Sequence, residues 1–116
     1  MLRLTEQDID AIAESRLEAS RRRRVNVFRL SAPHLLHGMD NLEALLFMER
    51  HERSARAHGL KTDRGFFQWT YLMGASGGRF AESDEIRNHI KGENPDARLD
   101  DIMRLMANAA KEGTRA

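Results

Sequence analysis

The sequence predicts an all-α fold, a single compact bundle of about five helices with a central, aromatic third helix. Apolar residues recur every three or four positions along most of the chain, which is the period of an amphipathic helix. Residues typical of helix caps stand in front of these stretches, and no stretch shows the alternation of a strand. The 116 residues, 41% of them hydrophobic, are enough for one core, so we expect one domain over residues 1–116.

Composition argues against several classes of protein. The 19 basic and 18 acidic residues leave a net charge of +1, unlike a dedicated nucleic-acid binder. The absence of cysteine excludes disulfides, thiolate metal sites and a cysteine nucleophile. Residues 1–10 lack the apolar core of a signal peptide, and no run reaches the roughly 18 apolar residues of a membrane helix. We therefore expect a cytoplasmic, bacterial-type protein that does not enter membranes.

The first two helices are predicted from their caps. Thr5, with Asp8 three residues later, has the form of a capping box and starts a long helix over residues 5–30. Pro33 stops it, and residues 34–39 form a connector with at most a turn of helix. Asp40 starts the second helix and Gly59 ends it, because glycine adopts the left-handed conformation at little cost.

The remaining three helices surround a glycine-rich loop. Thr62 can cap the third helix, which is apolar on almost every side and therefore predicted to be central. Gly74 and Gly77 end it, and we expect Phe80 to anchor the following loop. Ser83 or Asp84 starts a short fourth helix. Residues 94–95, Asn-Pro, start the last one, and residues 113–116 should fray.

Candidate binding residues come from the aromatic cluster and an arginine run. Most of the aromatic residues are expected in the core, yet one helix carries more large apolar groups than one buried face needs. Tyr and Trp are also enriched at interaction hot spots. The candidates for partner binding are Phe47, Phe66, Trp69, Tyr71, Arg79 and Phe80. The candidates for electrostatic steering are Arg21, Arg22, Arg23 and Arg24, which on a helix point all the way round rather than forming one flat patch.

No residue pattern predicts catalysis, a cofactor or a metal. The five histidines include no HExxH pattern. The acidic residues Glu82, Asp84, Glu85, Asp100 and Asp101 fall at helix starts or on polar faces, where the helix dipole explains them. The loop at residues 76–79 follows no strand and lacks a phosphate-binding signature. The second and third helices resemble a helix-turn-helix in spacing, but the third is too apolar to read DNA.

Four stretches together resemble a known group of proteins. These are residues 57–63 (AHGLKTD), the aromatic helix, residues 77–80 (GGRF) and residues 90–106 (IKGENPDARLDDIMRLM). This order is similar to that of small helical bacterial proteins encoded beside toxins and PAAR or VgrG spike components of type VI secretion systems. The resemblance covers about residues 50–106. The matching positions are Ala55, Ala57, Gly59, Thr62, Phe67, Leu72, Gly77 and Phe80.

The resemblance implies a non-enzymatic accessory role with no catalytic residues. Such a protein would stabilise, load or neutralise a secreted effector as an adaptor or chaperone-like partner. An immunity protein that blocks a co-encoded toxin is the alternative, and an acidic patch would favour it. A small DNA-binding regulator that uses the basic first helix is a further alternative. Homodimerisation through the aromatic surface is left open by all three.

Overall fold

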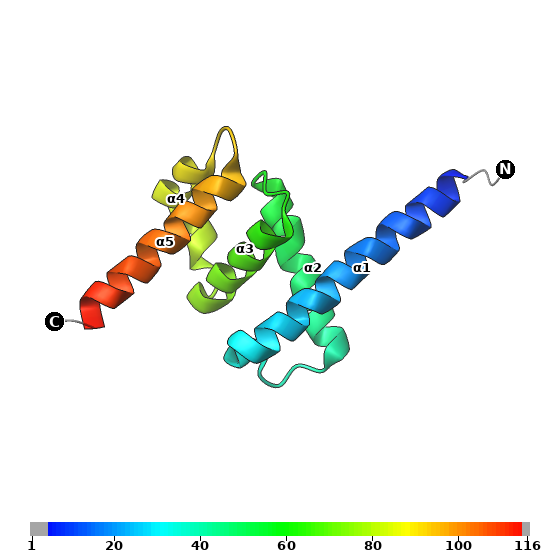
Figure 1. The fold of residues 1–116 in the computed structure, drawn as a ribbon, viewed down its shortest axis with the longest axis horizontal. Helices are drawn as coiled ribbons and strands as arrows, with labels where there is room; N and C mark the ends of the chain where they lie inside the picture. Colours follow the sequence, from blue (N-terminus) through cyan, green and yellow to red (C-terminus); the bar gives the residue numbers. More distant parts are fainter. Residues whose placement is uncertain (1–4, 115–116) are drawn as a thin grey trace. The chain divides into compact units, whose positions relative to one another are not determined.

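The computed structural model describes residues 5–114, and within this range every regular element is helical (Figure 1). The elements are α1 (Glu6–Ser31), the 3-10 helix η1 (Pro33–Leu36), α2 (Asn41–Ala57), α3 (Asp63–Ser76), the 3-10 helix η2 (Arg79–Glu82), α4 (Asp84–Ile90) and α5 (Pro95–Thr114). The prediction of an all-α fold with about five helices is confirmed. None of the helices described is long and apolar enough to cross a membrane.

The contacts divide the chain into two compact units. Unit 1 is Met1–Glu49 and unit 2 is Arg50–Ala116, so the boundary falls inside α2. The expectation of a single domain stays a prediction.

Both ends of α1 follow the predicted signals. The Thr5 hydroxyl accepts a hydrogen bond from the Asp8 backbone N–H at 3.1 Å, and the Asp8 carboxylate accepts one from the Thr5 N–H at 3.0 Å. This reciprocal pair is the predicted capping box. The helix runs to Ser31, one residue beyond the predicted end, and Pro33 opens η1. The expected connector thus contains one short turn of helix.

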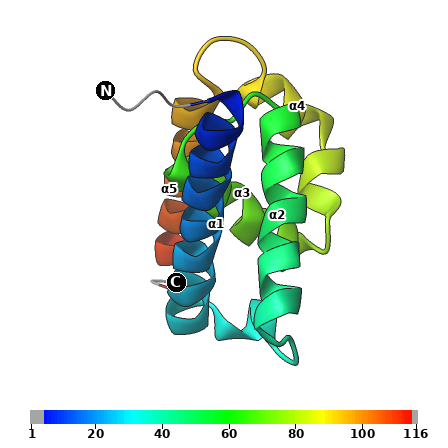
Figure 2. The ribbon, with the colours of Figure 1, turned by 90° about the vertical axis from the view of Figure 1, so that its right-hand side faces the viewer.

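In unit 1, α1 and the first half of α2 run in opposite directions on either side of η1 (Figure 2). Buried apolar residues of α1, such as Val25 and Phe28, lie in its C-terminal half. The N-terminal half is different, because between residues 5 and 19 only Leu17 is even half-buried. Ile9 and Ile12 of the predicted apolar stripe are 54% and 43% exposed. The helical period was predicted correctly, but within the described part of unit 1 this stretch of the stripe remains exposed.

In unit 2, α3 lies at the centre and packs against α5 and η2. Thr62 caps it as predicted, since its hydroxyl accepts a 2.9 Å hydrogen bond from the Gly65 N–H. Gly59 ends α2 with a φ of +88°, and the Leu60 N–H donates to the Ala55 carbonyl at 3.0 Å. The helix passes Gly74 and ends at Ser76, where Gly77 takes the left-handed conformation. The turn at Gly59 thus connects the end of α2 to the start of the central helix α3 within a few residues.

The last two helices begin at the predicted caps. The Ser83 hydroxyl accepts from the Ile86 N–H and starts α4, which has only seven residues. Asn94 precedes α5 with a φ of +56°, a left-handed conformation that asparagine tolerates better than most residues. α5 continues to Thr114, and the remainder of the stretch expected to fray, residues 115–116, lies outside the described residues.

Candidate functional site

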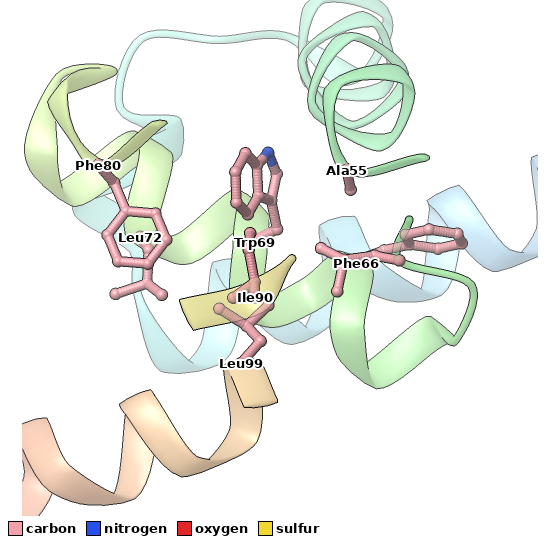
Figure 3. Close-up of a cluster of buried hydrophobic side chains, with 8 residues drawn as sticks. Ala55, Phe66, Trp69, Leu72, Phe80, Ile90 and Leu99 are labelled. Carbon is pink, nitrogen blue, oxygen red and sulfur yellow. The ribbon is translucent and has the colours of Figure 1, made fainter. Parts of the chain in front are cut away.

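Three of the proposed partner-binding residues form the centre of the core of unit 2. Trp69 is fully buried, and Phe66 and Phe80 are 3% and 7% exposed. Figure 3 shows the Trp69 indole between Phe80 on one side and Phe66 on the other. The other buried members of the cluster are Ala55, Leu60, Leu72, Ile90 and Leu99. A partner cannot reach these three aromatic side chains in this conformation, whereas the expectation that Phe80 anchors the loop is confirmed.

The indole of Trp69 is held by both polar and aromatic contacts. Its Nε1–H donates to the Ser54 hydroxyl at 3.2 Å, so the buried donor is satisfied. Phe80 meets the ring edge-on, with centroids 5.6 Å apart and planes at 79°. His58 lies 4.6 Å from the indole, and its Nδ1 is 2.8 Å from the Ser54 carbonyl oxygen. A carbonyl oxygen only accepts, so Nδ1 carries a proton and donates to it.

The role of His58 was not predicted. In the sequence His58 stands next to Gly59, which is typical of a histidine at a helix end. The reversal of the chain at Gly59 brings α3 back beside the end of α2, and this places His58 on Trp69. The contact joins residues eleven positions apart across a tight turn, so no helical spacing within one element indicates it.

The other three candidates do not join this cluster. Tyr71 is half-buried and packs against its edge. Arg79 is exposed at the start of η2. Phe47 is only 8% exposed and belongs to unit 1. Of the six residues, only Tyr71 and Arg79 therefore present a substantial part of the side chain to solvent, and neither makes a large apolar patch.

The four arginines of α1 also differ in exposure. Arg22 and Arg23 are exposed, and Arg21 is half-buried. Arg24 is only 4% exposed and donates to the Ser20 hydroxyl at 2.8 Å. The Arg22 guanidinium pairs with Glu18 one turn earlier at 2.8 Å. Electrostatic steering would therefore rely on the first three arginines, because burial shields the fourth from an approaching partner.

Two aspartates of α5 tie this helix to α3. The Asp96 carboxylate accepts from the backbone N–H groups of Lys61 and Thr62 and from the Thr62 hydroxyl, the last at 2.6 Å. Gly65 is part of this junction, since a Cβ atom built on it would collide with the Asp96 carboxylate. A larger residue at position 65 would therefore displace the Asp96 carboxylate from its hydrogen bonds at the start of α3.

Asp100 makes the second link, one turn further along α5. Its Oδ1 accepts from Gln68 Nε2 at 2.9 Å and from Arg64 at 2.7 Å, and Arg104 approaches Oδ2 at 3.1 Å. The Gln68 hydrogen bond, followed by the two arginines, holds the pKa of Asp100 below its ordinary value although partial burial opposes this. The carboxylate therefore remains charged and acts as a structural acceptor.

The proposed acidic patch is only partly available to a basic partner. Asp100 is engaged as described, and Asp84 forms an ion pair with Arg87 on α4. Glu82, Glu85 and Asp101 are exposed. Two of the five acidic candidates are thus already paired with arginines of the same chain.

An exposed apolar surface of unit 2 follows one face of α5. This face is fully buried at Leu99, half-buried at Ile102 and Met103, and 51% exposed at Met106. One further turn along, Ala110 is also exposed. The helix thus continues beyond the core that covers its first half, as the orange-to-red helix in Figure 1 illustrates. We call residues 99, 102, 103, 106 and 110 the α5 face.

The α5 face contains the right residues to bind another apolar surface. Methionine is unbranched and polarisable, and it adapts to irregular partners. The helical spacing of these residues in the sequence indicates that this side of the helix is apolar. A stripe in the sequence shows which side of a helix is apolar, but not how far along the helix the core extends.

Unit 2 also contains a surface pocket. A pocket of about 540 Å³ opens between the end of α2 and α4, with His58, Arg87, Lys91 and Pro95 among its lining residues. Among residues 5–114, no cluster of three or more His, Asp or Glu side chains is arranged to hold a metal ion. Comparisons with protein families, curated proteins and solved structures found no match to this chain.

Proposed function

We propose that this protein is a non-enzymatic protein–protein interaction module, an adaptor or chaperone-like partner of a secreted bacterial effector. The observation that carries the proposal is the α5 face, which passes from fully buried at Leu99 to half-exposed at Met106 on the same side of one helix. An apolar helix face that continues beyond its own core suits an apolar segment of another protein.

The resemblance to accessory proteins of type VI secretion systems suggests what kind of partner this is. The resembling segment, about residues 50–106, includes the first part of the α5 face. The proposed partner is therefore an effector or a spike component, bound through an apolar segment. Arg22 and Arg23 are exposed and would assist encounter with an acidic partner rather than determine affinity.

The proposal is tested by isolating the tagged protein from its native cell and identifying what accompanies it. The variant Met106→Glu places a charge on the α5 face. The matched control is Asn108→Glu, because Asn108 is also exposed and lies about 200° further round the helix. We expect a secretion effector or spike component with the wild type and with Asn108→Glu, but not with Met106→Glu. Retention of that partner by Met106→Glu would refute the role of the α5 face.

An immunity protein is the second candidate, and the exposed acidic residues Glu82, Glu85 and Asp101 are the observation in its favour. The adaptor role is preferred because Asp84 and Asp100 already pair with arginines of the chain. Co-expression with the captured effector distinguishes the two roles, since only an immunity protein abolishes the toxicity of the effector. Recovery of DNA without a protein partner would instead support a regulator, and its binding should weaken steeply with salt.

A further inference from the structure

We propose that α1 forms an antiparallel pair with α1 of a second copy of this chain. The large exposed apolar residues of α1 are Ile9, Ile12, Val27 and Leu30, which are 54%, 43%, 46% and 88% exposed. At about 100° per residue, they fall within a sector of roughly 60° of the helix surface. These four residues define the α1 stripe. It lies on a different side of the helix from the buried residues Val25 and Phe28.

The α1 stripe is symmetric about the middle of the helix. Ile9 and Leu30 lie equally far from a point between Ala19 and Ser20, and so do Ile12 and Val27. A second copy running in the opposite direction therefore places Ile9 against Leu30 and Ile12 against Val27. The two-fold symmetry forms each of these pairs twice in the dimer. Between the two apolar pairs, the exposed Arg16 and Arg23 lie in the same sector of the helix, and Ala19 lies just beside it. Such a self-complementary surface is what a two-fold interface requires.

The charges of α1 favour the same arrangement. Residues 6–18 contain five acidic residues and one basic residue, whereas residues 19–31 contain five basic residues and no acidic one. Antiparallel pairing brings each acidic half against the basic half of the other copy. Parallel pairing would bring like charges together, which is destabilising. The apolar spacing and the net charges of the two halves thus both favour a second copy of this helix in the antiparallel direction. Within the sector of the α1 stripe itself, the same register places Arg16 opposite Arg23 of the other copy.

None of the four residues of the α1 stripe lines the pocket between α1 and α2, although Ser20, close to the edge of the stripe, is buried. The pocket between α1 and α2 is lined by Arg22, Val25 and Asn26 of α1 with Asn41 and Leu45 of α2. Leu30, by contrast, is almost fully exposed. A second copy can therefore dock on the stripe without displacing these contacts. This pairing goes beyond the proposed adaptor function and does not depend on it.

The first experiment is sedimentation equilibrium of the full chain over a range of concentrations. We expect a monomer–dimer equilibrium that weakens as salt is raised, because the complementary halves are exposed. Leu30→Glu should weaken the dimer at least about 100-fold, since two apolar contacts per dimer are lost. The control Leu105→Glu, on a residue 65% exposed on α5, should leave the equilibrium unchanged. A protein that stays monomeric up to about 1 mM, or a Leu30→Glu dimer of wild-type affinity, would overturn the proposal.

A second variant tests the direction of pairing. Arg16 is exposed and is the basic residue within the acidic half of α1. In the antiparallel dimer it faces the basic half of the other copy, so Arg16→Glu should strengthen the dimer about 3- to 10-fold. In a parallel dimer the same variant adds like charge and weakens association. Weakening by Arg16→Glu would therefore refute the antiparallel arrangement.

Disulfide formation tests the register, because the chain contains no cysteine of its own. A mixture of Ile9→Cys and Leu30→Cys proteins should give a mixed disulfide, while neither variant should form one efficiently alone. A disulfide requires Cα atoms about 4.4–6.8 Å apart, so it reports direct opposition. Efficient cross-linking of each variant with itself, or none in the mixture, would contradict the proposed register.

Discussion

Replacing Trp69 with alanine should remove the centre of the unit 2 core. The side chain is fully buried and lies among Phe80, His58 and the aliphatic residues of α3, α4 and α5. Truncation of a buried aromatic residue to alanine costs about 3–5 kcal/mol. The loss of the Nε1–H bond to Ser54 is included in that range, and it leaves the serine hydroxyl without this donor.

The assay is thermal unfolding followed by far-UV circular dichroism. For a chain of this size, 1 kcal/mol corresponds to about 4 °C, so Trp69→Ala should lower the melting temperature by about 12–20 °C. Trp69→Phe keeps most of the buried ring and loses the hydrogen bond, and it should lower the melting temperature far less. Leu105→Ala, on a side chain 65% exposed, is the control and should shift stability by no more than about 0.5 kcal/mol.

The reasoning fails if Trp69→Ala melts within about 4 °C of the wild type. Truncating a central buried residue should cost more free energy of unfolding than such a small shift represents. The wild type provides a related measurement, since Trp69 is the only tryptophan and reports on unit 2 alone. Circular dichroism reports on the helices of both units. Coinciding transitions by fluorescence and circular dichroism would support the expected single domain, and separate transitions would contradict it.

Two further predictions concern the junction between α3 and α5. Gly65→Ala should destabilise the protein by about 1–3 kcal/mol, because the new methyl group collides with Asp96; in chemical denaturation, the double variant Gly65→Ala/Asp96→Ala should lose less than the sum of the single losses. Asp100→Asn should make the melting temperature depend less on pH in the acidic range. The folded chain holds the pKa of Asp100 below its ordinary value, so this stability is complete above the unfolded pKa of about 3.9 and is lost as the pH falls through the lower folded pKa. Melting temperatures between about pH 6 and pH 2 measure it, and an equal acid-induced drop in both proteins would refute this role of Asp100.

Local structure was predictable because its causes are local. Thr5 and Asp8 form their capping box within one turn of helix, and Thr62 caps α3 through a residue three positions away. Gly59 ends α2 through its own backbone conformation. Each of these features depends on a few consecutive residues, so the sequence pattern alone is sufficient to indicate it.

Contacts between distant residues were not predictable in the same way. Asp96 lies 34 positions from Thr62, yet it accepts hydrogen bonds from that residue's backbone and hydroxyl. The sequence presents Asp96 as an ordinary acidic residue in the first turn of a helix, which the dipole explains. Gly65 has no spacing or neighbour in the sequence that indicates a contact with α5. Both acquire a specific role only when α5 is placed across the start of α3.

The exposure of the candidate binding surfaces was also not predictable from the sequence. Helical spacing correctly identified the apolar faces of α1 and α5, but it contains no information on what covers them. The chain covers the α5 face at Leu99 and leaves it open at Met106, and it leaves Ile9 and Leu30 of α1 open as well. Three of the aromatic candidates, Phe66, Trp69 and Phe80, are buried because the turn at Gly59 and the close approach of α5 enclose them.

The two exposed apolar surfaces differ in a way that separates their proposed roles. The α1 stripe is symmetric along the helix. One end of it lies in the acidic half and the other end in the basic half, so a second copy of the helix complements it. The α5 face becomes more exposed in one direction only, from Leu99 to Met106, and has no such symmetry. Leu30→Glu should therefore weaken self-association and leave binding of the effector partner unchanged. Met106→Glu should prevent binding of that partner and leave self-association unchanged. If either variant abolished both activities, the two surfaces would be parts of one interface, and partner binding would depend on the dimer.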